Sequence, residues 1–262
     1  MSSNGNKEII ESTIYRQYIH HKPTPINNII SKFKAIDFIL SFAGEDYDAH
    51  GKGTGNFHPT WSLAELNIEW LKKLKEDVPH ARVVISIGGV DSEFPFDPIE
   101  KHIWIYNAIN SIKRINHDYY NNLIDGIDIH YDVIKSSVDQ FSNYIGEFIR
   151  QLKNDTDLSI NVVSIAPNKP FESYYRYLYF HNKYVIDIIH YAFYDMILVE
   201  EVEQIYKKLV AIYTPTIVLP IISFDMDPIV KEFFENLLKN KLIPGIVVWD
   251  IDNPLLAPTL SL

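Results

Sequence analysis

The sequence predicts a single (β/α)₈ barrel, and three observations support this fold class. Apolar, β-branched runs recur at nearly even intervals along the 262 residues. Amphipathic helical patterns lie between the runs, and an alternation of strands with helices is typical of a parallel sheet. No composition break or flexible linker divides the chain, and barrels of this kind commonly have this length. We therefore expect one domain over residues 1–262 with a closed sheet at its centre.

Each strand of the barrel can be assigned to one apolar run. We expect strands at residues 14–19, 35–42, 82–87, 124–130, 158–165, 185–193, 216–222 and 245–249. Apolar residues at three- and four-residue steps predict helices near residues 63–74, 103–115, 138–152 and 230–238. We interpret these helical stripes as packing surfaces, because none of them contains a cofactor motif. No cofactor is therefore expected.

The two ends of the chain depart from this repeat. Residues 1–11 form a polar arm without an apolar h-region, so no secretory signal is expected. Pro254 and Pro258 interrupt residues 251–262, which predicts an irregular tail in place of a full final helix. An inward-facing Trp249 would leave the outer side of the last strand in need of a cover. The apolar tail, the amino-terminal arm or a second subunit would supply it, so this seam is where a homo-oligomer would form.

The amino-acid composition restricts the cellular compartment and the binding partners that we expect for this protein. Cysteine is absent, which excludes disulfides and thiol chemistry and fits a reducing, cytoplasmic setting. Acidic residues outnumber basic ones by 34 to 24, and this balance argues against nucleic acid or an anionic membrane surface as a partner. No apolar run is long enough to span a bilayer.

The predicted fourth strand carries an unusual row of side chains. Alternation along a strand places Ile127, Ile129 and Tyr131 on one face. The opposite face then carries Gly126, Asp128, His130 and Asp132. Three titratable groups in a core are costly unless they are hydrogen-bonded or paired. The row is therefore either a functional site or a buried polar network that supports the interior.

This strand also resembles a known family. Asp125, Gly126 and Asp128 match the Asp-Gly-x-Asp-x-Asp-x-Glu strand of glycoside hydrolase family 18, the chitinase-type barrels. Within that superfamily, the sequences of residues 83–89, 161–167 and 51–55 resemble those of narbonin-like plant seed proteins. These segments read Val-Val-Ile-Ser-Ile-Gly-Gly, Asn-Val-Val-Ser-Ile-Ala-Pro and Gly-Lys-Gly-Thr-Gly. The resemblance extends over nearly the whole chain.

The resemblance implies a sugar site at the carboxyl ends of the strands. Its ligand-binding candidates are Ser86, Gly88, Asp128, Tyr194 and Trp249. Tyr194 matches a tyrosine that braces the substrate's acetamido group, and Trp249 matches a tryptophan that forms the floor of the site. Ala192 and Asp195 stand where the plant-type segment has Gln and Asn. The resemblance further implies non-proline cis peptide bonds at 41–42 and 249–250, and a chito-oligosaccharide as the ligand.

Two departures affect the chemistry that the family performs. Its members cleave β-1,4-linked N-acetylglucosamine: the acetamido carbonyl attacks, a Glu protonates the leaving oxygen, and an Asp two residues earlier assists. Asp132 stands in place of the Glu and retracts the carboxyl by about 1 Å, a displacement that can cost about a hundredfold. His130 replaces the assisting Asp and brings no negative charge. Loss of the general acid would cost about 10²–10⁴-fold.

These departures predict a non-catalytic chitinase-like barrel. The resemblance to narbonin-like proteins implies a storage or structural role, with the cleft filled by its own side chains. One alternative is a lectin-like protein that binds chito-oligosaccharides. The other is a weak endo-chitinase that uses Asp132 as the acid. Under the first two hypotheses, the motif Asp125, Gly126, Asp128, His130 and Asp132 is a degenerate catalytic motif.

Other readings of the sequence are less favoured. A metal site is not expected, because groups two residues apart on one strand rarely converge on an ion. The segment 51–55 lacks the spacing of a phosphate loop and is interpreted as a flexible surface turn. Tyrosines at 174, 175, 177 and 179 are interpreted as a cover for the barrel, with sugar stacking as the alternative. Polar candidates at other strand ends are Tyr15, Tyr18, Glu45, Tyr191, Asp225 and Asp227.

Overall fold

A computed structural model describes residues 14–23, 33–90, 92–193, 195–223 and 225–249. Within these residues, eight parallel strands form a closed sheet in the order β1-β9-β8-β7-β6-β5-β4-β2, and β1 pairs with β2 to complete the ring. The strands are β1 (Ile14–Ile19), β2 (Ala35–Tyr47), β4 (Ala81–Gly89), β5 (Gly126–Tyr131), β6 (Val162–Ile165), β7 (Ile188–Ala192), β8 (Val218–Ser223) and β9 (Gly245–Trp249). The predicted (β/α)₈ barrel is confirmed. The polar arm, the tail and Tyr194 lie outside the described residues.

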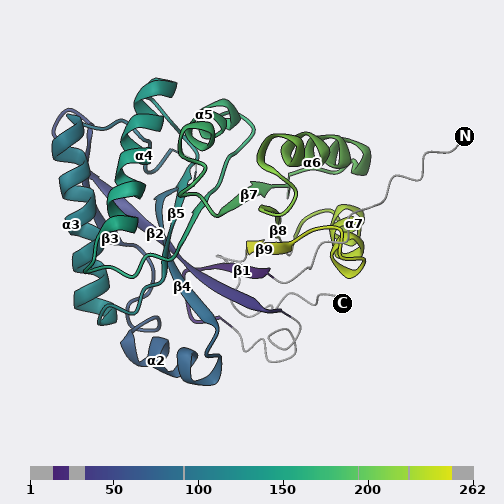
Figure 1. Cartoon of the computed structure of the whole chain (residues 1–262), viewed down its shortest axis with the longest axis horizontal. Helices are drawn as coiled ribbons and strands as arrows, with labels where there is room; N and C mark the ends of the chain where they lie inside the picture. The colour runs from purple at the N-terminus through teal and green to yellow at the C-terminus, as the bar shows by residue number, and fades with distance from the viewer. Residues whose placement is uncertain (1–13, 24–32, 91, 194, 224, 250–262) are drawn as a thin grey trace, which may run out of the picture.

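Helices follow the strands and surround the sheet (Figure 1). They are α2 (Ile68–Asp77), α3 (Lys101–Tyr120), α4 (Val138–Asn154), α5 (Glu172–Asn182), α6 (Val199–Tyr213) and α7 (Pro228–Lys239). Several begin at a side chain that accepts hydrogen bonds from first-turn amides, such as Ser137 before α4 and Asp227 before α7. No helix among the described residues is both apolar enough and long enough to cross a bilayer.

Two apolar layers hold the barrel together. The first fills the inside of the sheet and includes Tyr18, Phe42 and Val247. The second lies between the sheet and the helices, and it contains the outward residues of β5, including Ile127 and Ile129. The two faces predicted for this strand are therefore confirmed. Trp249 packs against the inner layer, while Ile246 and Val248 are buried in the outer one.

A short strand, β3 (Gly53–Pro59), was not expected. It pairs antiparallel with the end of β2, which runs five residues beyond its predicted limit, and it packs beside α3. The surface-turn interpretation of 51–55 holds for the turn at 48–52 but is wrong for residues 53–55. Gly55 lies at φ +77°, and a Cβ there would approach the backbone oxygen of Trp104 to 2.3 Å. The glycines obscured this strand because they interrupt the alternation that marks one.

The tyrosine-rich segment forms α5 and mainly covers the barrel. The Tyr175 hydroxyl accepts a hydrogen bond from the backbone N–H of Tyr131 and donates one to its carbonyl. The Tyr179 hydroxyl donates to the carbonyl of Tyr213. These contacts attach α5 to β5 and α6, in agreement with the covering role predicted for the segment.

Candidate functional site

Asp128 lies at the centre of the barrel interior and is fully buried. Its neighbours across the ladder are Ser86 on β4 and Ser164 on β6. The Ser86 hydroxyl donates to Oδ2 at 2.8 Å, and the Ser164 hydroxyl donates to Oδ1 at 2.5 Å. Tyr18 on β1 donates to Oδ2 at 2.9 Å. Both carboxylate oxygens therefore have donors, which offsets the cost of burying the charge.

Arg16 and His190 extend this hydrogen-bond network within the barrel interior. Arg16 Nε contacts Asp37 Oδ2 at 2.7 Å, and both side chains are fully buried. Arg16 Nη1 lies 2.5 Å from His190 Nε2. A guanidinium can only donate, so His190 Nε2 accepts and its proton lies on Nδ1. Burial, and then the Arg16 charge, hold the pKa of His190 well below its ordinary value, which keeps this ring neutral.

Tyr18 connects this network to His130. Burial, and then the charge of Asp128, raise the pKa of Tyr18 well above its ordinary value, so the hydroxyl keeps its proton for Asp128. Its two lone pairs face His190 Nδ1 at 3.0 Å and His130 Nδ1 at 3.1 Å. Both imidazoles must therefore donate to Tyr18. This assignment places a proton on His130 Nδ1 and leaves Nε2 directed toward Asp132.

His130 and Asp132 meet at the mouth of the barrel. His130 Nε2 lies 3.4 Å from Asp132 Oδ1, with side-chain exposures of 6% and 24%. Asn168 Nδ2 donates to the same Asp132 oxygen at 3.1 Å. A ring with its single proton on Nδ1 presents Nε2 as an acceptor beside this carboxylate oxygen, so the two atoms offer acceptors to the same space.

A pocket of about 500 Å³ opens above this pair. It is lined by the end of β5, the loop between β6 and α5, and the loop between β7 and α6. The polar lining residues are His130, Asp132, Asn168, Lys169, Asp195 and Glu201. The remaining wall is apolar and includes Ala192, Met196 and Ile221. The mouth of the barrel is therefore open on this side.

The other predicted residues lie around this pocket without lining it. Ser86 and Asp128 are buried beneath it and bind each other. Gly88 pairs with His130 across the ladder, and a Cβ there would approach the His130 carbonyl oxygen to 2.2 Å. The Trp249 ring centroid lies 5.5 Å from that of His130. The cis peptide bond implied at Ser41–Phe42 is present, whereas the one at 249–250 lies outside the described residues, as does Tyr194.

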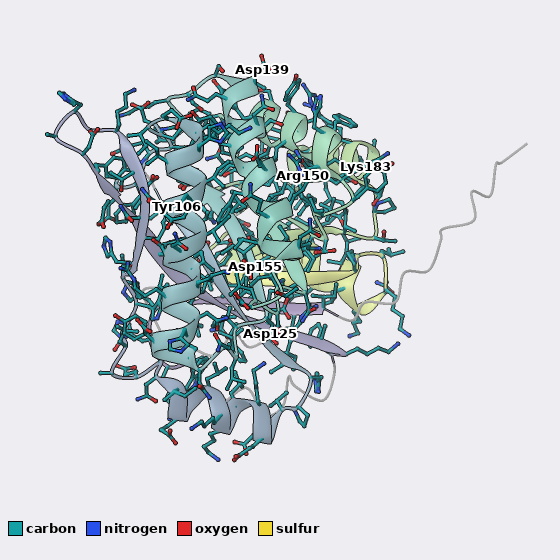
Figure 2. The ribbon with its side chains drawn as sticks, turned by 60° about the vertical axis from the view of Figure 1, so that its left-hand side comes forward. Tyr106, Asp125, Asp139, Arg150, Asp155 and Lys183 are labelled. Atoms are coloured by element: carbon teal, nitrogen blue, oxygen red, sulfur yellow. The ribbon has the colours of Figure 1, made fainter. Side chains whose placement is uncertain are left out.

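Asp125 and Glu45 lie away from the pocket. The Asp125 carboxylate accepts from Lys75 Nζ and from the backbone N–H of Val83, both at 2.7 Å. Figure 2 shows Asp125 far from Asp139, which lies in the first turn of α4, so Asp125 lies toward the opposite end of the barrel. Glu45 points toward α3, where Trp104 Nε1 donates to it at 2.6 Å. Both carboxylates therefore join elements of the fold.

Arg16, His190 and Ser164 belong to the site network but were not selected from the sequence. Each lies on a predicted strand, and a charged or imidazole side chain inside a buried strand was the signal that could have identified the first two. No group of three His, Cys, Asp or Glu suited to a metal ion occurs among the described residues. A larger hollow of about 600 Å³, near Tyr106 and Asp155, lies on the outside between α3 and α4 (Figure 2).

A closed parallel barrel that gathers titratable side chains at the carboxyl ends of its strands has the architecture in which barrel enzymes place their active sites. A family model described as Glycosyl hydrolases family 18 matches residues 3–206. The chain belongs to this family.

Individual relatives agree with this assignment. Chitinase 1 of Tulipa saxatilis subsp. bakeri is 30% identical over 274 residues, covering 95% of this chain and 84% of that protein. A RuBisCO-associated protein of Glycine max is 29% identical over 147 residues, covering 53% of this chain and 50% of that protein. The catalytic domain of a family GH18 chitinase from the fern Peteris ryukyuensis superimposes with a TM-score of 0.77 at 27% identity, covering 90% of this chain and 91% of that one.

Proposed function

We propose that this protein is a non-hydrolytic, saccharide-binding member of family 18. The observation that carries the proposal is the pair at the mouth: a shortened acid, Asp132, faces an imidazole in place of a carboxylate. Asn168 also donates to the Asp132 oxygen that faces His130. The carboxyl group of Asp132 is therefore retracted and already accepts a hydrogen bond from Asn168. His130, which stands where the family has the assisting Asp, brings no negative charge to orient the acetamido group of a substrate. Both changes disfavour the transition state of substrate-assisted hydrolysis.

Binding is supported by the open pocket. A volume of about 500 Å³ lies within the range of small-molecule sites. Its mixture of carboxylate, amide and apolar groups suits the polar edges and apolar faces of a sugar. The relative from tulip carries the name chitinase, so an oligosaccharide built from glucosamine units is the class of ligand to examine first.

An inert barrel with a storage or structural role is the second candidate. It is favoured by the interior, where Asp128, Tyr18 and the two histidines bind one another. Titration calorimetry with chito-oligosaccharides separates these candidates. Saturable heat supports the binding protein, and absence of heat with every oligosaccharide supports the inert barrel.

Restoring the family's two residues tests the loss of hydrolysis. We expect no turnover of a chromogenic chitobioside by the natural protein. The double substitution His130→Asp with Asp132→Glu should give turnover about a hundredfold or more above the background rate, because it restores the reach of the acid and its anionic neighbour. Asp118→Glu, an equivalent lengthening of an exposed side chain on α3, is the control. Turnover by the natural protein that disappears in Asp132→Ala would contradict the proposal and establish the weak endo-chitinase instead.

A further inference from the structure

The pocket has more hydrogen-bond acceptors than free donors. Carboxyl groups come from Asp132, Asp195 and Glu201, whereas Lys169 is the one lysine or arginine among the residues that line it in the described part of the chain. Lys169 Nζ already lies 3.6 Å from Glu201 Oε1. Asn168 directs its amide N–H groups to Asp132. A ligand that enters therefore meets acceptors whose best partners are donors or cations.

The net charge of the pocket lining also favours a cationic ligand. The opposite charges of Glu201 and Lys169 offset each other. The exposed carboxylate of Asp195 forms no ion pair with any other described residue, so it gives the lining a net negative charge. Ala192 presents a methyl group on the same wall and offers no side-chain donor to an acetamido carbonyl.

From these contacts we infer that the pocket selects glucosamine units with a free ammonium group over their N-acetylated counterparts. The inference rests on the proposed saccharide-binding function and names the class of sugar. An ammonium group above the pair can donate hydrogen bonds to both His130 Nε2 and Asp132 Oδ1. Asp195 adds attraction from the opposite loop.

The test is titration calorimetry at about pH 6, where surface carboxyl groups are ionised. The probes are a fully deacetylated glucosamine tetramer and the tetra-N-acetylated tetramer. We expect saturable binding of the first, at least about tenfold tighter than any binding of the second. Binding should weaken as sodium chloride is added, because the attraction is partly exposed.

Asp195→Asn should weaken binding of the deacetylated tetramer about three- to tenfold, because it removes an exposed carboxylate from the rim. Asp118→Asn is the matched control, since it makes the same change on the far end of α3 and should leave binding unchanged. Equal or tighter binding of the acetylated tetramer, or an unaltered Asp195→Asn, would overturn the inference while leaving the saccharide-binding function intact. Failure of both tetramers to bind would refute the binding function as well.

Discussion

Asp128 and Glu45 are both buried carboxyl groups on barrel strands, but their surroundings differ. Asp128 accepts hydrogen bonds on both oxygens, from Tyr18, Ser86 and Ser164. Glu45 accepts on Oε1 alone, from the backbone N–H of Gly55 at 2.9 Å and from Trp104 Nε1 at 2.6 Å. Glu45 Oε2 makes no hydrogen bond with the described part of the chain.

The difference shows what a buried carboxylate needs. Burial raises the pKa of Glu45 to about 7, against the opposing hydrogen bonds from Gly55 and Trp104, with smaller increases from Asp46 and Asp97. Donors on one oxygen do not offset the desolvation of the whole group. In the barrel interior, the carboxylates instead have donors or cations around them, as Asp37 does between Arg16 and Arg82.

The largest effect is expected where the interior network loses a charge. Asp37→Asn leaves Arg16 fully buried without its counter-charge, and we expect a loss of about 3–5 kcal/mol in the free energy of unfolding. Denaturation by urea measures it. Asp77→Asn, which removes a carboxylate from an exposed pair with Lys73, is the control and should cause little change. A loss in Asp37→Asn no larger than in the control would show that the interior tolerates an unpaired cation.

Glu45 should make stability depend on pH. Its pKa rises from 4.5 to about 7 on folding, so between these values the unfolded state releases a proton that the folded state keeps. The contribution is therefore fully present below about pH 4.5 and is lost as the pH rises through about 7, a change of about 3 kcal/mol. Glu45→Gln imitates the protonated group and should remove this decline.

Urea denaturation of both proteins between about pH 4.5 and 8 provides the measurement for Glu45. Glu69→Gln, on the exposed face of α2, should keep the decline of the natural protein. If the natural protein and Glu45→Gln follow parallel pH profiles, the carboxyl group does not hold its proton through folding and the comparison with Asp128 fails.

The smallest of these effects concerns the hydroxyl that links the two histidines. Tyr18→Phe removes one donor to Asp128 and the acceptor for His130 Nδ1 and His190 Nδ1, and we expect a loss of about 2 kcal/mol. Tyr184→Phe, at a ring that is 88% exposed, is the control. Histidine NMR should show a changed ring-proton pattern for His130 in Tyr18→Phe. An unchanged spectrum would contradict the tautomer assigned above.

Much of the fold could be predicted because its signals are local. Two predicted strands, at 14–19 and 245–249, match the observed limits, and the two faces of β5 follow from simple alternation. The fourth strand was also the right place to look for titratable groups. By contrast, β3 escaped detection because its glycines allow close approaches to distant residues, Gly53 to Glu45 and Gly55 to Trp104. The sequence of the strand itself does not contain these contacts.

The site was only partly predictable for a similar reason. His130 and Asp132 lie two residues apart in sequence and meet at the mouth, as alternation suggests. Arg16 and His190 lie 174 residues apart, and they meet because closure of the barrel directs β1 and β7 toward the same interior. Whether the mouth was open could not be read from the sequence either, since it depends on how the loops after β6 and β7 pack.

The sequence alone determined the parallel barrel, its family and the two substitutions at the end of β5, because periodicity and residue identity are properties of the chain itself. The tertiary structure decided which atoms share protons, which carboxyl group lacks donors, and that a pocket with excess acceptors opens above His130 and Asp132. These depend on distances between strands far apart in the chain, and such distances are fixed only when the sheet closes and the helices pack around it.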